Sequence, residues 1–167
     1  KITNCIPKQV ESLTLKLRQS GLIVEEGESS LRVICDGQLN GVNIKTQPHP
    51  GFATDLQAQF MALMTLAQGK SIVLETVFEN RFMHVAELKR MGADITIQGR
   101  TAVVSGVQEL SGAPLMATDL RASASLVLAA LAAKGESVIS RVYHIDRGYS
   151  DIEQKLYRLG AKIRREK

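Results

Sequence analysis

The segment ATDLRASASLVLAALAAKG, residues 117–135, decides the fold because it predicts a helix with no polar face. Its ionisable side chains lie at the two ends, where Asp119 and Arg121 precede the apolar run and Lys134 follows it. The residues between them are only Ala, Ser, Leu and Val, a composition typical of a helix that is buried on all sides. We therefore expect this helix inside the molecule, with an acid and a base at its beginning.

A second segment, ATDLQAQFMALMTLAQG at residues 53–69, begins and ends like the first and predicts a second buried helix. In each copy the closing Gly is followed by a β-like run and a polar turn with Arg, in KSIVLETVFENR and ESVISRVYHIDR. Arg81 lies 12 positions after Gly69, and Arg147 lies 12 positions after Gly135. The chain therefore contains a duplication that keeps its register here.

An amphipathic helical pattern and a Gly follow each Arg, in HVAELKRMGADI and SDIEQKLYRLGAKI. A third copy of the amphipathic helix and its closing Gly, PKQVESLTLKLRQSGLIV, lies near the start of the chain. No buried helix precedes it. The helix-ending glycines Gly21, Gly92 and Gly160 are 71 and 68 residues apart, a period typical of a compact supersecondary unit. Predicted strand pairs follow the first two: LIVEEG with SLRVICDG, and ADITIQ with TAVVSGV.

The repeating unit is thus strand, buried helix, strand, amphipathic helix, strand, strand, which predicts an α/β fold of βαβαββ repeats. We expect one domain over residues 1–167, because no Pro- or Gly-rich linker divides the chain. It would hold a partial repeat over about residues 1–47, a repeat over about 48–112 and a partial repeat over about 113–167. Because the chain starts inside one unit and stops inside another, we expect residues to be missing at both ends.

The composition is that of an ordinary globular domain, with 44% hydrophobic and 23% charged residues. The apolar runs are too short for a membrane span, and two cysteines do not make a disulfide framework, so we expect a cytoplasmic protein. The net charge of +4 comes from scattered Lys and Arg, and aromatic residues are few. This pattern argues against nucleic acid and favours anionic small molecules as ligands.

Four segments resemble the C-terminal half of the bacterial UDP-N-acetylglucosamine enolpyruvyl transferases: TDLQAQFMAL, ETVFENRFMHVAELKRMGA, MATDLRASASLVLA and YHIDRGYSDIEQKLYRLGAKI. The resemblance covers nearly the whole chain. The related shikimate-pathway enolpyruvyl transferases share the fold but carry a different segment in place of YHIDRGY. The resemblance implies a two-domain enzyme in which each domain is an inside-out α/β barrel of three repeats, with helices inside and sheets outside. This chain would be one such barrel, incomplete at both ends.

The reaction that the resemblance implies is transfer of the enolpyruvyl group of phosphoenolpyruvate to the 3-hydroxyl of UDP-N-acetylglucosamine, with release of phosphate. It needs no cofactor. It is the first committed step of peptidoglycan synthesis, and so belongs to cell-wall biogenesis, cell shape, the cell cycle and cell division. Both substrates are anionic, so carboxylates and arginines at helix ends suit the chemistry.

Two predicted site residues carry roles that the resemblance assigns. Asp55 matches the residue that contacts the sugar 3-hydroxyl and is proposed as its catalytic base. Judged from the sequence pattern by itself, an acid after Thr54 at the start of a buried helix would instead stabilise the helix N-terminus. Val77 matches a position whose backbone contacts the nucleotide sugar, and a role as a core strand valine is compatible with that contact.

Three arginines match substrate-binding residues of the family. Arg147 matches an Arg that binds phosphoenolpyruvate; in HIDRG, a Gly after a strand-end Arg predicts a tight turn with the guanidinium facing the cleft. Arg81 and Arg121 match other arginines of the cleft. The alternatives are a solvated surface charge for Arg147 and a structural ion pair for each of the other two.

The remaining polar residues are expected to take no part in the chemistry. Asp119, the duplicate of Asp55, is expected to cap its helix or to pair with an arginine. The histidines lack a metal-ligand arrangement, so we predict no metal; they are His49, His84 and His144. Solvated or loop charges are expected at Glu75, Glu79, Glu87 and Lys89.

The resemblance implies that the catalytic Cys of the family and a phosphate-binding Lys belong to an N-terminal domain, which we expect to lie outside residues 1–167. Neither Cys5 nor Cys35 matches that Cys, so the fragment is expected to be inactive without its missing partner domain. Two alternatives stay open besides the shikimate-pathway transferase: a non-catalytic repeat domain that binds a nucleotide sugar, and one that binds a protein. An RNA-binding role is disfavoured by the dispersed charge.

Overall fold

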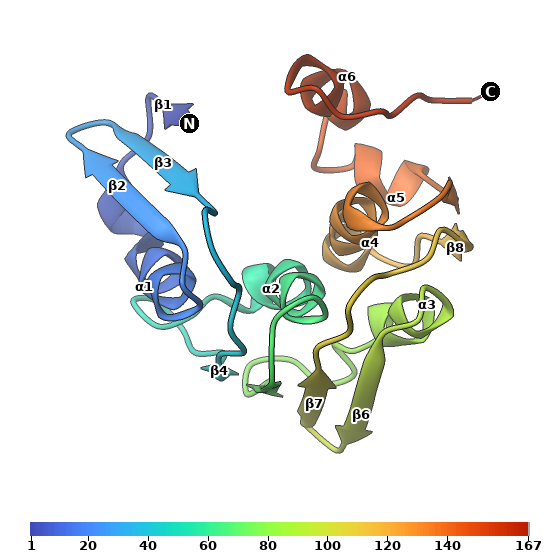
Figure 1. Cartoon of the computed structure of the whole chain (residues 1–167), viewed down its shortest axis with the longest axis horizontal. Helices are drawn as coiled ribbons and strands as arrows, with labels where there is room; N and C mark the ends of the chain where they lie inside the picture. The colour runs from blue at the N-terminus through green and yellow to red at the C-terminus, as the bar shows by residue number, and fades with distance from the viewer. Residues whose placement is uncertain (167) are drawn as a thin grey trace.

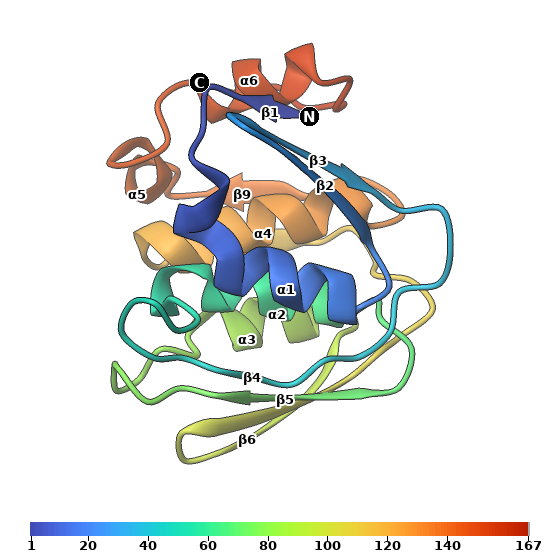
Figure 2. The same cartoon turned by 90° about the vertical axis from the view of Figure 1, so that its left-hand side faces the viewer.

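The computed structural model, which describes residues 1–166, has central helices packed against strands and further helices at its periphery (Figures 1 and 2). The helices are η1 (Pro7–Val10), α1 (Glu11–Gln19), η2 (Thr54–Leu56), α2 (Gln57–Met64), α3 (His84–Arg90), α4 (Leu120–Ala132), α5 (Tyr143–Asp146) and α6 (Ile152–Arg158). The strands are β1 (Ile2–Thr3), β2 (Ile23–Gly27), β3 (Ser30–Ile34), β4 (Ile44–Lys45), β5 (Lys70–Leu74), β6 (Asp94–Gln98), β7 (Thr101–Ser105), β8 (Pro114–Met116) and β9 (Val138–Ser140). This arrangement confirms the predicted α/β class.

Helix α4 occupies the centre of the helical layer. It packs along α2 and also contacts α3 and α5. In Figure 2, α4, α2 and α3 follow one another from top to bottom, with β4, β5 and β6 below them. Met61, Leu88 and Leu126, from three different helices, are fully buried in this layer, and burying each such side chain stabilises the fold by about 1.5–3 kcal/mol. The predicted burial is confirmed for most of α2 and for part of α4.

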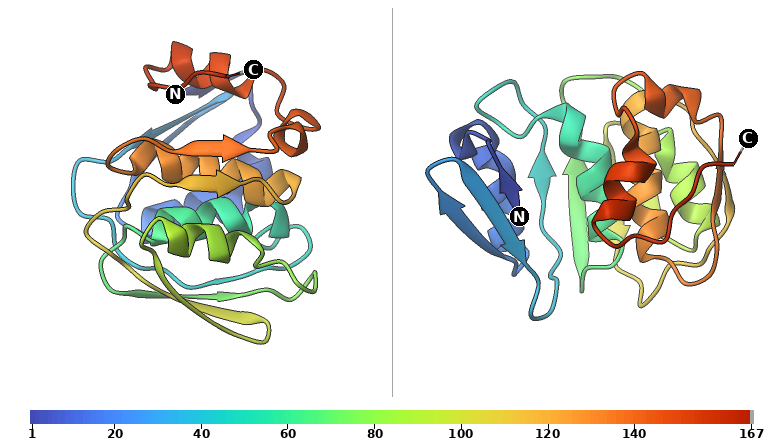
Figure 3. Two further views of the ribbon diagram at one scale, coloured as in Figure 1. Left: turned by 90° about the vertical axis from the view of Figure 1, so that its right-hand side faces the viewer. Right: turned by 90° about the horizontal axis from the view of Figure 1, so that it is seen from above.

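The sheets repeat one topology in two copies. Strands β4 and β5 flank α2 and pair in parallel, with Ile44 opposite Val73, while β8 and β9 flank α4 and pair in parallel, with Leu115 opposite Ile139 (Figure 3, left). Each set is a strand–helix–strand crossover. The predicted antiparallel pairs are confirmed as β2–β3 and β6–β7, the latter completing the sheet β4-β5-β7-β6.

Helix α2 is shorter than its sequence pattern predicts, because it ends at Met64 rather than near Gly69. The chain tightens there, with the Leu66 N–H bonded to the Leu63 carbonyl and the Ala67 N–H bonded to the Met64 carbonyl. Such bonds to the third preceding residue are those of a 3₁₀ turn.

One face of α4 is exposed, so the expectation that it is buried on all sides is wrong. Leu128 and Leu131 keep 45% and 38% of their surface accessible. In the preceding repeat α2 contacts both β5 and β7, whereas within residues 1–166 the last repeat forms only the two-stranded sheet β8–β9. The face of α4 that a further strand would cover therefore stays open.

Gly106, which follows β7, is predicted to be intolerant of a side chain. A Cβ at this position would overlap the carbonyl oxygen of Ala67, part of the backbone. Because the backbone must then move, Gly106→Ala should lower the free energy of unfolding by about 3 kcal/mol. Gly37→Ala is the control, since a Cβ there meets no atom within 4 Å. Denaturant unfolding measures both variants, and equal midpoints would contradict the prediction.

Candidate functional site

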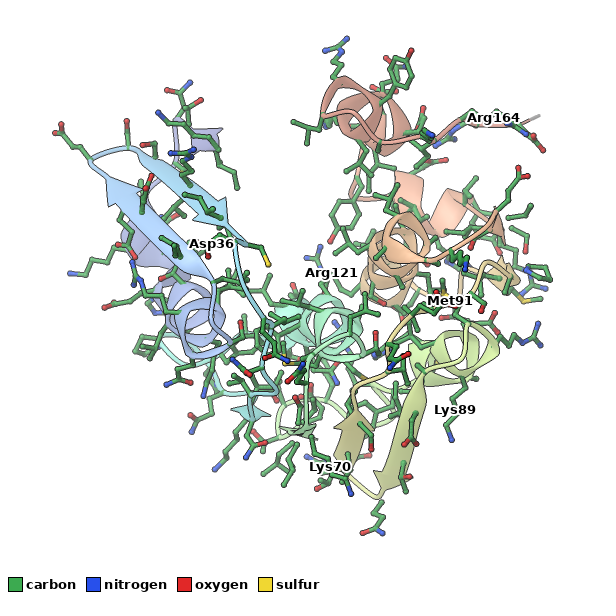
Figure 4. The ribbon with its side chains drawn as sticks, viewed as in Figure 1. Asp36, Lys70, Lys89, Met91, Arg121 and Arg164 are labelled. Carbon is green, nitrogen blue, oxygen red and sulfur yellow. The ribbon has the colours of Figure 1, made fainter. Side chains whose placement is uncertain are left out.

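Asp55 lies in η2, immediately before α2, and its carboxylate is bound by two arginines from distant parts of the chain. Arg81 Nη2 donates to Oδ1 at 3.0 Å, and Arg121 Nη2 donates to Oδ2 at 2.7 Å. Arg81 follows the loop after β5, while Arg121 lies in the first turn of α4 and projects towards α2 (Figure 4). The structure therefore brings three of the five predicted site residues together.

The two arginines keep Asp55 ionised. The hydrogen bond from Arg121 has the largest effect and lowers the carboxyl pKa below its usual value; partial burial opposes it, and the charges of Arg121 and Arg81 add to the lowering. The Asp55 side chain is still 50% exposed, so solvent reaches this carboxylate. The site thus presents an accessible anion between two cations that other anions could also bind.

Tyr149 and Gln59 also belong to this cluster, and neither was predicted from the sequence. The Tyr149 hydroxyl accepts hydrogen bonds from Arg121 Nη1 and from Gln59 Nε2, each at 3.3 Å. The Arg121 guanidinium also lies over the Tyr149 ring, 5.9 Å from its centroid. These contacts fix the direction of Arg121. The available signal was the segment YHIDRGY, whose last residue is this tyrosine.

The loop after β5 carries Val77 and Arg81. Val77 is 39% exposed, so it is not a core residue, and its N–H donates to Glu75 Oε1 at 2.8 Å. No residue in the described part of the chain donates to the Val77 carbonyl. The Arg81 guanidinium lies over the Phe78 ring, 5.1 Å from its centroid, and this cation–π contact helps to hold the side chain.

Arg147 does not join the cluster, and its predicted setting at a strand end is wrong. Residues of HID form the short helix α5, and Arg147 follows it with helical backbone angles and an exposed side chain. The chain leaves β9 at Arg141, where φ is 59°, so the sharp turn occurs earlier than expected. A Cβ at Gly148 would lie 2.9 Å from Leu120 Cδ2, so the Leu120 side chain would have to shift to accommodate it. Arg147 forms no ion pair within residues 1–166.

Two of the glutamates predicted to be solvated are buried. Glu75 is 1% exposed and Glu87 is 7% exposed, whereas Glu79 and Lys89 are exposed as predicted. Glu87 Oε2 accepts the Met116 N–H at 3.0 Å, which ties α3 to β8. The helical pattern around Glu87 could not reveal this, because the partner is 29 residues away.

Asp119 caps α4, as predicted. Its Oδ1 accepts the N–H groups of Arg121 and Ala122 at 2.8 and 2.9 Å. Cys5 and Cys35 are free thiols. In the part of the chain that the structure describes, no group of three His, Cys, Asp or Glu side chains is placed to hold a metal ion. None of the described helices is both long and apolar enough to cross a membrane.

His84, fully buried at the start of α3, predicts a loss of stability in acid. Burial lowers its pKa to about 4, with the Asp119 charge raising it and the Arg81 charge lowering it. The unfolded chain protonates this ring near pH 6.5, so stability falls as the pH drops from there to about 4, by about 3 kcal/mol in total. Denaturant unfolding across this range should show a flatter profile for His84→Gln. In the control His49→Gln, at an exposed site, the free energy of unfolding should depend on pH as it does in the wild type. The same dependence in His84→Gln would contradict the role of His84 in acid destabilisation.

The sequence is similar to a known protein family and to individual known proteins. The family described as EPSP synthase (3-phosphoshikimate 1-carboxyvinyltransferase) matches residues 1–156. A UDP-N-acetylglucosamine 1-carboxyvinyltransferase of Thermodesulfovibrio yellowstonii is 56% identical over 98% of this chain and 39% of the relative. The corresponding protein of Anaeromyxobacter sp. is 60% identical over 99% of this chain and 39% of the relative. The chain thus spans about two fifths of the length of these relatives.

Solved structures share the fold. The enolpyruvyl transferase NikO from Streptomyces tendae is 31% identical and superposes with a TM-score of 0.85 over 93% of this chain and 36% of that protein. EPSP synthase from Acinetobacter baumannii superposes with a TM-score of 0.73 over 93% of this chain and 40% of that protein, at 19% identity. The second likeness concerns the fold alone.

Proposed function

The chain belongs to the EPSP synthase family of enolpyruvyl transferases, and from this premise we propose that it is part of a UDP-N-acetylglucosamine 1-carboxyvinyltransferase. The proposed reaction transfers the enolpyruvyl group of phosphoenolpyruvate to the 3-hydroxyl of UDP-N-acetylglucosamine and releases phosphate. The chain would be one domain of that full-length protein and would act with a further domain of the same polypeptide. A cytoplasmic location and a role in peptidoglycan synthesis, cell shape and cell division go with this proposal.

The observation that carries the proposal is the Asp55 carboxylate held between Arg81 and Arg121. In the proposed reaction the sugar hydroxyl oxygen bonds to C2 of phosphoenolpyruvate while a proton reaches C3; phosphate then leaves C2 and C3 loses a proton. Asp55 takes the hydroxyl proton. An ionised, half-exposed carboxylate suits this role.

The arginines reconcile the lowered pKa of Asp55 with its role as a base. With no substrate bound, hydrogen bonds and charge from Arg121 and Arg81 make this carboxylate a weak proton acceptor. Anionic groups of the substrates that bind these guanidiniums would compete for their charge, so the basicity of Asp55 rises when both substrates are present. Base strength would thereby be coupled to substrate binding.

Two further residues are proposed to bind substrate from outside the cluster. The Val77 amide is already bonded to Glu75, so the group left for the nucleotide sugar is the Val77 carbonyl, which accepts from an N–H or O–H. Arg147 is exposed beyond α5 and forms no ion pair within residues 1–166, so its guanidinium is available to phosphoenolpyruvate. The proton donor to C3 would come from the part of the protein beyond this chain.

Phosphate release by the full-length protein tests the proposal. With phosphoenolpyruvate present, we expect release when UDP-N-acetylglucosamine is the acceptor and none when shikimate 3-phosphate replaces it. The opposite preference would assign the chain to the shikimate-pathway transferases. No turnover with either acceptor, together with binding of the nucleotide sugar, would instead support a non-catalytic domain.

A further inference from the structure

Glu75, directly after β5, is a buried carboxylate with four hydrogen-bond donors. Its Oε1 accepts from Thr46 Oγ1 at 2.8 Å and from the N–H groups of Val77 and Phe78 at 2.8 and 3.0 Å. Its Oε2 accepts from Thr54 Oγ1 at 2.9 Å. Only 1% of the residue is exposed. All four donors are neutral, and no basic side chain of residues 1–166 pairs with this carboxylate.

The four hydrogen bonds stabilise the charge. Burial raises the pKa of Glu75, but the bonds from Phe78, Thr46, Val77 and Thr54 outweigh it, so the pKa lies below its usual value and the group stays ionised. A buried anion that satisfies four donors is costly to remove, because each donor is then left without a partner. The geometry of these segments therefore depends on Glu75.

The segments that Glu75 joins carry the proposed chemistry. Thr54 directly precedes Asp55, while the Val77 and Phe78 amides belong to the loop that leads to Arg81. Thr46 lies just beyond β4 and links to the same loop, because its Oγ1 accepts the Thr76 N–H at 2.8 Å. One carboxylate thus sets the distance between the Asp55 turn and the backbone of Val77.

The duplicated repeat shows what happens without this carboxylate. Aligning KSIVLE with ESVISR places Arg141 at the position of Glu75, and aligning the two ATDL segments places Thr118 at the position of Thr54. Arg141 is exposed, and the buried Thr118 hydroxyl has no hydrogen-bond partner in residues 1–166. In that repeat Asp119 turns to the backbone and caps α4.

In the repeat that has Glu75, the acid behaves differently. Asp55 makes no side-chain cap bond at η2, and its carboxylate reaches Arg81 and Arg121 instead. The hydroxyl of its neighbour Thr54 is held by Glu75. The two repeats therefore differ in two ways. One has Glu75 where the other has Arg141, and Asp55 points to arginines whereas Asp119 points to the backbone.

We propose that Glu75 is a positioning residue that holds Asp55 and the Val77 backbone in register for the nucleotide sugar, without touching substrate itself. This inference rests on the proposed function. A displacement of about 1 Å at a reacting group can lower the rate by about 100-fold. Glu75 should therefore affect both turnover and the KM for the nucleotide sugar, and leave the KM for phosphoenolpyruvate unchanged.

Steady-state kinetics of Glu75→Ala, Glu75→Gln and Thr54→Val in the full-length protein test the proposal, with thermal unfolding followed in parallel. In Glu75→Ala, kcat/KM for UDP-N-acetylglucosamine should fall by about 100-fold, with kcat lowered and KM raised. Glu75→Gln should recover most of this loss, because its carbonyl can keep the three Oε1 bonds and its amide can donate to Thr54. Thr54→Val removes only the link to the Asp55 turn and should lower kcat by about 10-fold. The control Glu79→Gln, in the same loop but exposed, should behave like the wild type.

Two outcomes would overturn the assignment. One is wild-type kcat and KM in folded Glu75→Ala. The other is a loss of folded protein in that variant with unchanged kinetics per folded molecule and normal kinetics in Thr54→Val, which would make the role structural. If Glu75→Ala does not fold, Thr54→Val decides: a lowered kcat in the folded variant supports the proposal, and wild-type kinetics overturn it. An inactive wild type would contradict the proposed function, whereas an active wild type with normal variants contradicts only the role of Glu75.

Discussion

Replacing Asp55 by Asn in the full-length protein should lower kcat by about 1,000-fold, within the range that positioned general bases contribute. The amide cannot take a proton from the sugar hydroxyl, although it keeps the size and shape of the side chain. Since Asp55 is half-exposed and makes no cap bond, the thermal unfolding midpoint should stay close to that of the wild type.

Phosphate release under saturating substrate measures this effect, and circular dichroism checks the fold. Asp36→Asn serves as the control, because Asp36 is an exposed loop residue after β3 (Figure 4). A near-normal rate in folded Asp55→Asn would remove Asp55 from the mechanism.

The second large effect is expected for Arg121→Ala, which should lower kcat/KM by about 100-fold or more. The variant loses a cation for the substrates and the main hydrogen bond to Asp55. The pKa of Asp55 should then rise towards its usual value, because the bond from Arg121 is the largest cause of its lowering. The acid limb of the pH–rate profile should accordingly move to higher pH.

Arg121→Lys sharpens this test. A single ammonium cannot reproduce the planar fork that contacts Asp55 and Tyr149 together, so Lys should recover only part of the activity. The control Arg32→Ala removes an exposed arginine whose partner is Glu25 on the neighbouring strand. Full activity in Arg121→Lys would show that charge alone suffices.

Much of the fold was predictable because its signals are local. Helix periodicity, strand alternation and the closing glycines each depend on a few neighbouring residues, and the duplication repeats them. The predicted pairs β2–β3 and β6–β7 and the buried α2 followed from such patterns. Helix ends were less predictable, as α2 shows, because the last turn depends on what packs against it.

The candidate site was predictable only in part. The family resemblance selected Asp55, Arg81 and Arg121, which the structure brings together, and its assignments to Val77 and Arg147 stay predictions. Glu75 looked like a loop charge because its four donors lie up to 29 residues away. Burial of a carboxylate is a property of the assembled fold, so no local pattern indicates it.

Local sequence patterns were enough to predict the repeating unit, the burial of α2 and the residues through which the family can be identified. Only the tertiary structure decided that Asp55 faces Arg121, which lies 66 residues away, while the matching Asp119 caps its own helix. The physical reason is that both acids occupy the same local pattern. Their partners differ because the fold brings Arg81 and Arg121 to the Asp55 carboxylate, whereas the Asp119 carboxylate accepts N–H groups of its own helix.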